Sequence, residues 1–257
     1  MGKHGVRVGC AGWSIPSQHK RLFDPGDGML ARYATRFSVV EVNSSFYRRH
    51  RTSTYERWAA AVPAHFHFSV KLPQRITHEL ALRGTGPTLD RFLGEVKGLG
   101  GKLGGFLLQL PPSLALDGRA ASAFFRVFRR RSEVALACEP RHASWFTAKG
   151  DDLFERFAVT RVAADPARVP STGCPSPDPI WPYWRWHGSP RMYYSAYSDA
   201  ALAKLASLVD RTGTAPNPPW VIFDNTAHGS ATDDAARFQK LGGSRSKSKA
   251  FRGRARA

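Results

Sequence analysis

The amino-acid sequence predicts an α/β fold, a single (β/α)8 TIM barrel in which eight parallel strands alternate with helices. Short apolar stretches rich in β-branched and aromatic residues recur along the chain, and helical patterns lie between them. The length of 257 residues is typical of such a barrel. A doubly wound open sheet is the alternative, but the glycine-rich segment that follows its first strand is absent.

Eight stretches have the composition of buried strands. In chain order they are Val6–Trp13, Phe37–Asn43, His65–Leu72, Gly104–Leu110, Val134–Glu139, Thr160–Asp165, Tyr183–Gly188 and Trp220–Asn225. The clearest helical patterns are Leu89–Lys97, Ala120–Arg131, Ala200–Val209 and Thr232–Leu241. The connection Pro166–Pro182 is rich in proline and has no helical period, so we expect an irregular crossover or a loop over the barrel mouth.

The charge balance indicates an anionic partner. The chain has 38 Lys and Arg against 20 Asp and Glu, a net charge of +18. No apolar run approaches the ~20 residues of a membrane span, and the N-terminus lacks the apolar region of a secretory signal. Three widely spaced cysteines predict neither a disulfide framework nor a CxxC metal site, so we expect a cytoplasmic protein.

The basic charge is densest at the C-terminus. Residues 242–257 are rich in Gly and Ser and hold six Lys and Arg but no acid. Removing these six cations from the net +18 leaves +12 for residues 1–241. We therefore expect one barrel domain, 1–241, and a disordered basic tail, 242–257, that either keeps the protein in solution or contacts nucleic acid weakly.

Polar residues interrupt the predicted strands near their C-terminal ends. Side chains alternate across a strand, so the apolar set packs under the helices and the other set points into the barrel. Burying many ionisable groups costs several kcal/mol each unless they are paired or hydrated. Barrel enzymes carry their active sites at this end, so we expect a functional cavity there. Its members are Glu41, Asn43, Lys71, Gln109, Glu139, Asp165, Arg185 and His187.

The segment that leaves the fifth predicted strand holds Glu139, Arg141 and His142. Glu139 can act as a general acid or base, and Arg141 would meet an anionic substrate at the mouth. His142 or His187 can carry a proton near neutral pH. The alternative is an internal ion pair of Glu139 with Arg141 or Arg185.

Lys71 faces inward at the end of the third predicted strand. It can form a Schiff base, contact a phosphate or pair with Glu41, and we favour the last two. The loops after the seventh and eighth strands are rich in small residues, which suits phosphate binding and places Asn225 at the site. Among the aromatic residues near the mouth, Trp13 and Tyr194 are the candidates for ligand contact.

A metal site is not predicted, and the sequence identifies no cofactor. Five residues can ligate a divalent cation, but no HExxH or HxH spacing stands at the mouth, and the charges of Lys71, Arg141 and Arg185 oppose a cation. The five are Glu41, Glu139, His142, Asp165 and His187.

Several motifs occur in a fixed order: GCAGWS at 9–14, VEVNSSFY at 40–47, FSVK at 68–71, ITH at 76–78, LGGKLG at 99–104, LQLPP at 108–112, EPRHASWF at 139–146, WHG at 186–188 and FDN at 223–225. Together they resemble the YecE-like family, a domain of unknown function. The resemblance implies a barrel but no established reaction; metal-dependent abasic-site endonucleases are an analogy only. Two departures are Asp224 where the family usually has Asn, and Pro140 at a variable position. The site that the resemblance implies contains Glu41, Asn43, Lys71, Gln109, Glu139, Arg141, His142, Arg185, His187 and Asn225.

Our leading hypothesis is an enzyme, a hydrolase, lyase or isomerase, that acts on a phosphorylated or carboxylated small molecule by acid–base chemistry at the barrel mouth. The first alternative is a nucleic-acid-binding protein, with or without the activity of an endonuclease-like, metal-dependent phosphodiesterase. The second is a ligand sensor or scaffold without catalysis.

Overall fold

The computed structural model describes residues 5–167, 169, 174–176, 180–211 and 217–241. The predicted tail, 242–257, and part of the predicted connection Pro166–Pro182 lie outside these residues. Within the described part of the chain, no helix is long and apolar enough to cross a membrane.

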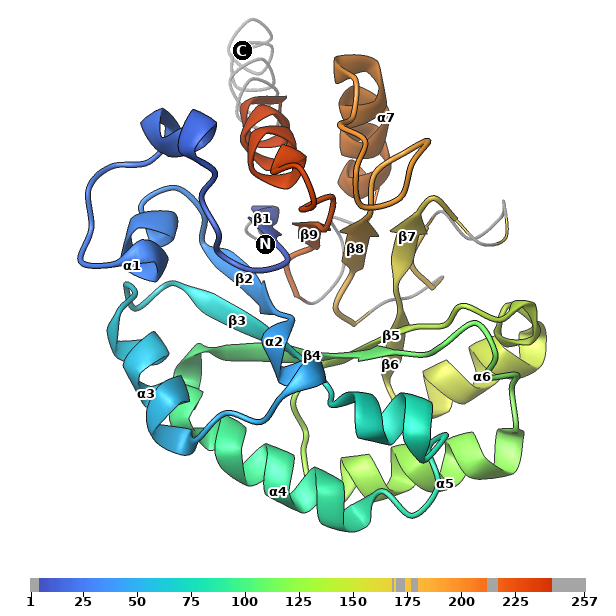
Figure 1. The fold of residues 1–257 in the computed structure, drawn as a ribbon. Helices are drawn as coiled ribbons and strands as arrows, with labels where there is room; N and C mark the ends of the chain where they lie inside the picture. The colour runs from blue at the N-terminus through green and yellow to red at the C-terminus, as the bar shows by residue number, and fades with distance from the viewer. Residues whose placement is uncertain (1–4, 168, 170–173, 177–179, 212–216, 242–257) are drawn as a thin grey trace, which may run out of the picture.

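The strands are parallel and form two sheets (Figure 1). The smaller sheet has the order β1 (Arg7–Cys10), β9 (Trp220–Phe223), β8 (Tyr183–Trp186) and β7 (Ala163–Asp165). The larger sheet has the order β2 (Val39–Val42), β3 (His67–Lys71), β4 (Leu103–Gln109), β5 (Leu136–Glu139) and β6 (Val159–Arg161).

The α/β fold with parallel strands is confirmed, but a closed eight-stranded barrel is not. The predicted sixth strand is divided at Val162, so that β6 pairs with β5 in one sheet and β7 pairs with β8 in the other. The amide of Val162 still donates to the carbonyl of Cys138 at 2.8 Å before the chain changes sheets. On the other side, an isolated parallel bridge joins Ala11 to Glu41. The sheets therefore adjoin at both edges without a continuous ladder.

Helices cover the outer faces of both sheets (Figure 1). The helices α3 to α6 surround the larger sheet, while α7 and a last helix, residues 230–241, lie beside the smaller one. Their bounds are α1 (Met29–Ala34), α2 (Ser44–Tyr47), α3 (Thr52–Ala60), α4 (Gly86–Val96), α5 (Gly118–Arg129), α6 (Ala148–Arg156) and α7 (Asp199–Asp210). Shorter helical turns are η1 (Ser17–Leu22), η2 (Arg75–Glu79), η3 (Lys97–Lys102) and η4 (Ala143–Trp145).

The helices begin slightly earlier than the apolar period predicts because of their caps. The carboxylate of Asp117 accepts from the amides of Arg119 and Ala120 at 2.9 and 3.1 Å, which starts α5 at Gly118. Pro87 stands in the first turn of α4, where its missing N–H is tolerated.

The apolar core is divided by the sheets into two clusters, as the strand alternation predicts. Val40 and Val42 pack in the large outer cluster under the helices, while Val39 belongs to a smaller inner cluster between the sheets. The inner cluster consists of Val39, Leu107, Ala137, Val162, Trp181, Tyr183, Trp220 and Ile222.

Glycine lets the inner aromatic rings approach β4 closely. A Cβ atom on Gly105 would lie 2.3 Å from the ring of Trp181, and one on Gly104 would lie 2.7 Å from the ring of Trp220. Trp181 and Trp220 pack edge to face with ring centroids 5.1 Å apart. These rings fill the inner space near the N-terminal ends of the strands and leave the C-terminal ends to polar residues.

Candidate functional site

Charged side chains from both sheets meet at the C-terminal ends of the strands. They are almost completely buried, so each charge destabilises the fold unless it is paired or hydrogen-bonded. We call the following set the central cluster: Glu41, Lys71, Gln109, Glu139, Arg185, His187 and Asp224.

Arg185 occupies the middle of the central cluster. Its Nε and Nη2 atoms donate to Glu41 at 3.0 and 2.8 Å, and its Nη1 donates to Glu139 at 2.8 Å. Nη2 also lies 2.9 Å from the carboxylate of Asp224. The guanidinium thus joins three carboxylates, one from β2, one from β5 and one directly after β9, and Arg185 is 1 % exposed. The planar fork of arginine suits such multiple pairing.

His187 is held between two carboxylates. Its Nδ1 lies 2.9 Å from Asp224, and its Nε2 lies 3.1 Å from Glu139. Burial alone would lower the pKa of this imidazole, but the charge of Glu139 and the hydrogen bonds to Asp224 and Glu139 outweigh it and raise the pKa. His187 therefore favours its protonated form more than an exposed histidine does.

The two carboxylates beside His187 stay ionised. Burial would raise the pKa of Glu139, yet the charges of His187 and Arg185 together hold that pKa well below its usual range. Burial likewise opposes the ionised form of Asp224, and the charge of Arg185 with the hydrogen bond from His187 lowers the pKa of that carboxyl.

Lys71 differs from the other cations of the central cluster because its hydrogen bond goes to an amide. Its Nζ donates to Oε1 of Gln109 at 2.8 Å and lies 4.1 Å from the ring centre of Phe46. Among the described residues, no carboxylate lies within salt-bridge distance of Nζ. Burial, followed by the charge of Arg185, lowers the pKa of the Lys71 ammonium to about 8.

Arg141 lies at the rim of the central cluster, where its Nε donates to Oε1 of Glu139 at 3.0 Å. Its Nη2 donates to the hydroxyl of Tyr193 at 3.2 Å. The side chain of Arg141 is 11 % exposed, against 1 % for Arg185, so it is the more accessible of the two guanidinium groups. A void of about 10 Å³ beside Glu139 and His187 holds one water-sized ligand.

Comparison with known proteins assigns the family. The family model described as "Protein of unknown function DUF72" matches residues 7–255. The chain belongs to the DUF72 family. Curated relatives are the UPF0759 protein YecE of Escherichia coli K12, 29 % identical over 147 residues, and the UPF0759 protein YunF of Bacillus subtilis 168, 24 % identical over 151 residues. These matches cover 57 % and 55 % of the chain. The predicted resemblance to the YecE-like family is confirmed.

The chain spans about half the length of the curated relatives it matches, 52 % in both cases. Two solved DUF72 structures share the fold over nearly all of the chain. The protein from Thermotoga maritima MSB8 has a TM-score of 0.77 at 24 % identity and covers 93 % of this chain and 99 % of its own. The protein from Enterococcus faecalis V583 has a TM-score of 0.75 at 22 % identity, with 93 % and 97 % covered.

Several predicted site residues of this DUF72 chain lie outside the central cluster. Asp165 accepts from the hydroxyl of Tyr197 at 2.7 Å, because Val162 faces the inner cluster and the odd-numbered residues of this segment face away. Asn225 donates to the carboxylate of Asp234 at 2.6 Å, on the helix side of β9. Nδ1 of His142 lies 2.8 Å from the hydroxyl of Ser144, and the ring caps η4.

The remaining predicted residues make their contacts outside the central cluster. The ring of Trp13 packs on Trp58 with centroids 5.0 Å apart. The side-chain oxygen of Asn43 is buried, and no protein hydrogen bond satisfies it. Tyr194 packs against His228, and the guanidinium of Arg191 lies 4.0 Å from its ring centre.

Four residues of the site were missed by the sequence reasoning. Asp224 continues the inward alternation of Trp220 and Ile222, so strand parity alone could have found it in place of Asn225. The hydroxyl of Tyr183 donates to Glu41 at 2.8 Å and, by the same parity, precedes Arg185 and His187.

Tyr193 and His78 carry no such periodic signal because they lie on turns. Tyr193 has a φ of 70°, in the left-handed region, and its ring packs against His187 with centroids 5.5 Å apart. The ring of His78 packs on Phe46 at 5.1 Å, and after burial the charges of Lys71 and Arg141 lower its pKa.

The central cluster is rich in cations as well as carboxylates. Within the described ranges, no group of three or more His, Cys, Asp or Glu side chains has the arrangement of a metal site. What the geometry offers chemically is a set of fixed charges, one lysine whose pKa is lowered to about 8 by burial, and one histidine whose pKa is raised by its carboxylate neighbours.

Proposed function

We propose that the central cluster is the active site of an enzyme that acts on a phosphorylated or carboxylated small molecule by acid–base chemistry. The observation that carries this proposal is Lys71, an ammonium group that is 5 % exposed and bonded to an amide instead of a carboxylate. A buried charge without a counter-ion is costly, so its retention is best explained by a ligand or a proton transfer. The two sheets would act as one barrel with its site at the C-terminal strand ends.

The charge of the site suits an anion. The carboxylates of Glu41, Glu139 and Asp224 face the cations Arg141, Arg185 and Lys71, and protonated His187 adds a fourth positive charge. While Lys71 is protonated, one positive charge then remains to attract a substrate. Arg141 would meet the anionic group first because its side chain, 11 % exposed, is the most accessible of these cations.

Lys71 and His187 are the residues to which we assign proton transfer. Neutral Lys71 would act as the base, since its lowered pKa of about 8 lies close to neutral pH. Protonated His187 would donate a proton or stabilise negative charge. Glu139, which the sequence suggested as an acid or base, instead positions His187 and Arg141, because its own pKa is held too low for it to donate a proton.

A screen of sugar phosphates and small carboxylic acids tests this function, with Lys71→Met as the variant and Lys149→Met, an exposed lysine on α6, as the matched control. We expect turnover of at least one compound, a loss of about 10²–10⁴-fold in Lys71→Met, and an unchanged rate in the control. The rate of the wild type should rise with pH through about 8.

Three outcomes would overturn the proposal. The first is a Lys71→Met rate equal to that of the wild type. The second is tight binding of an anion without turnover, which would indicate a sensor. The third is that no member of the panel binds or reacts.

A second candidate function is nucleic-acid binding, favoured by a groove of about 180 Å³ near α2. Tyr47, which is 75 % exposed, lies there with Arg48, Arg75 and Arg91. An exposed aromatic ring among arginines can stack on a base while the cations contact the backbone. Affinity for a single-stranded oligonucleotide should then fall steeply between about 50 and 200 mM salt and should weaken in Tyr47→Ala. A flat salt response would exclude this function.

A further inference from the structure

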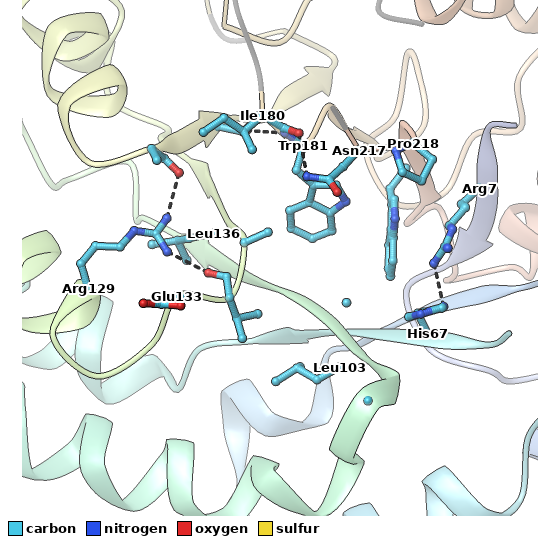
Figure 2. Close-up of a pocket in the computed structure, with 17 residues that line it drawn as sticks. Arg7, His67, Leu103, Arg129, Glu133, Leu136, Ile180, Trp181, Asn217 and Pro218 are labelled. Atoms are coloured by element: carbon cyan, nitrogen blue, oxygen red, sulfur yellow. Dashed lines mark hydrogen bonds between the residues drawn. The ribbon is translucent and has the colours of Figure 1, made fainter. Parts of the chain in front are cut away.

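A cavity of about 600 Å³ opens at the opposite end of the sheets from the central cluster (Figure 2). The first residues of five strands line it: Arg7 of β1, His67 of β3, Leu103 of β4, Leu136 of β5 and Trp220 of β9. The indole rings of Trp181 and Trp220 lie between this cavity and the polar ends of the strands, so the two sites are separate.

Arg7 is a cation without a counter-ion on one side of this N-terminal cavity. Its Nη1 lies 2.7 Å from Nδ1 of His67, and its guanidinium lies 6.0 Å from the ring centre of Trp220. Among the described residues, no carboxylate lies within salt-bridge distance of Arg7. Burial lowers the pKa of this guanidinium, and no acid counteracts the effect. Arginine has five N–H donors, so several remain for a ligand.

The opposite side of the cavity is less suited to an anion. There Arg129 donates to the carbonyls of Phe157, Val134 and Ala158, each at 2.8 Å, which uses three of its five donors. Figure 2 places Glu133 on that same side, and its exposed carboxylate repels an anion. Arg7 and His67 lie across the cavity from this pair.

Between these two sides several apolar side chains line the cavity. Leu103, Leu136 and Trp220 line it, and Ile180 at the rim is 43 % exposed. A small inorganic anion would neutralise Arg7 but leave this surface in contact with water. A ligand that combines one anionic group with an apolar body satisfies both features.

We propose that the N-terminal cavity binds an amphiphilic organic anion, whose charged group contacts Arg7 and whose apolar body lies along Leu103 and Ile180. The site is independent of the proposed catalytic function, because no residue of the central cluster lines it.

Two fluorescent probes test this proposal on the full chain. One is 8-anilinonaphthalene-1-sulfonate, an aromatic monoanion, and the other is N-phenyl-1-naphthylamine, the same body without the sulfonate. We expect saturable one-to-one binding of the sulfonate and affinity at least about tenfold above that of the neutral probe. Arg7→Gln should remove this preference, whereas Arg126→Gln, an exposed arginine on α5, should keep it.

A second variant addresses the cavity itself. A Cβ on Gly101, a lining residue, would meet no atom within 4 Å, so Gly101→Phe can add a ring to the cavity without a backbone clash. We expect this variant to lose binding of both probes while Lys71→Met retains it. The proposal fails if Arg7→Gln binds the sulfonate as tightly as the wild type. It also fails if Lys71→Met loses the sulfonate as Arg7→Gln does, since the probe would then occupy the other end.

Discussion

Replacing Arg185 by Met tests whether the central cluster is held together by this guanidinium. Three carboxylates lie 2.8 to 2.9 Å from its nitrogen atoms. Breaking one buried ion pair costs about 3–5 kcal/mol, because the remaining charge stays buried and unpaired. Arg141 and His187 still contact Glu139, and His187 still contacts Asp224, so Glu41 is the carboxylate that loses its cation. We therefore expect a loss of about 3–5 kcal/mol for the whole replacement, not three times that value.

The loss of stability in Arg185→Met should depend on pH, in a direction set by the pKa shifts of the carboxyl groups. The charge of Arg185 lowers the pKa of Glu139 and of Asp224 in the folded chain. A lowered carboxyl pKa stabilises the fold above the unfolded pKa of about 4, and this stabilisation is lost as the pH falls through the folded value. The difference in the free energy of unfolding between the wild type and Arg185→Met should be largest near pH 7 and should decrease below about pH 4.

Urea unfolding followed by tryptophan fluorescence measures both quantities. The control is Arg126→Met, whose exposed arginine on α5 should change the free energy of unfolding by about 0.5 kcal/mol or less. A loss below about 1 kcal/mol in Arg185→Met would refute the reasoning, as would an equal loss in the control. A difference in the free energy of unfolding that stays constant into the acid range would show that the pKa values of Glu139 and Asp224 do not depend on Arg185.

Two further predictions concern packing and protonation. Gly105→Ala should destabilise the fold by about 1–3 kcal/mol, because its Cβ would lie 2.3 Å from the ring of Trp181. The control is Gly101→Ala, whose Cβ would have no atom within 4 Å. Equal urea midpoints for the two variants would contradict the packing argument. His187 binds its proton more tightly when folded, so its stabilisation is complete below about pH 6.5 and is lost as the pH rises through the raised folded pKa. The wild type should therefore lose stability relative to His187→Asn above pH 6.5, and parallel pH curves for the two proteins would count against the raised pKa.

Strand alternation predicted most of the central cluster. In β2 it separates Glu41 from Val40 and Val42, and in β8 it separates Arg185 from Trp184 and Trp186. The prediction succeeds because the outer face of each strand packs under apolar helices. The polar residues of a strand must therefore lie on its inner face.

The sequence reasoning did not extend this alternation past the end of the strand. Asp224 and Asn225 follow β9, and the sequence reasoning selected Asn225, although the inward set Trp220 and Ile222 continues to Asp224. The division of the predicted sixth strand at Val162 could not be predicted either, because it depends on which sheet edge is free to accept β7. Loop residues such as Tyr193 are placed by tertiary contacts, for which composition and periodicity carry no information.

The fold holds its desolvated cations in two ways, with and without a carboxylate partner, and the second way is common to the two proposed sites. Arg185 shows that the fold can pair a buried guanidinium with three carboxylates. Lys71 and Arg7, in contrast, have an amide and an imidazole as partners. A charge that is desolvated without a counter-ion lowers the stability of the free protein, and a ligand that supplies the counter-ion recovers that free energy on binding. Each unpaired cation should therefore contribute more to ligand affinity than to folding. Arg7→Gln and Lys71→Met should therefore lower the free energy of unfolding by no more than about 1 kcal/mol, in contrast to the large loss expected for Arg185→Met.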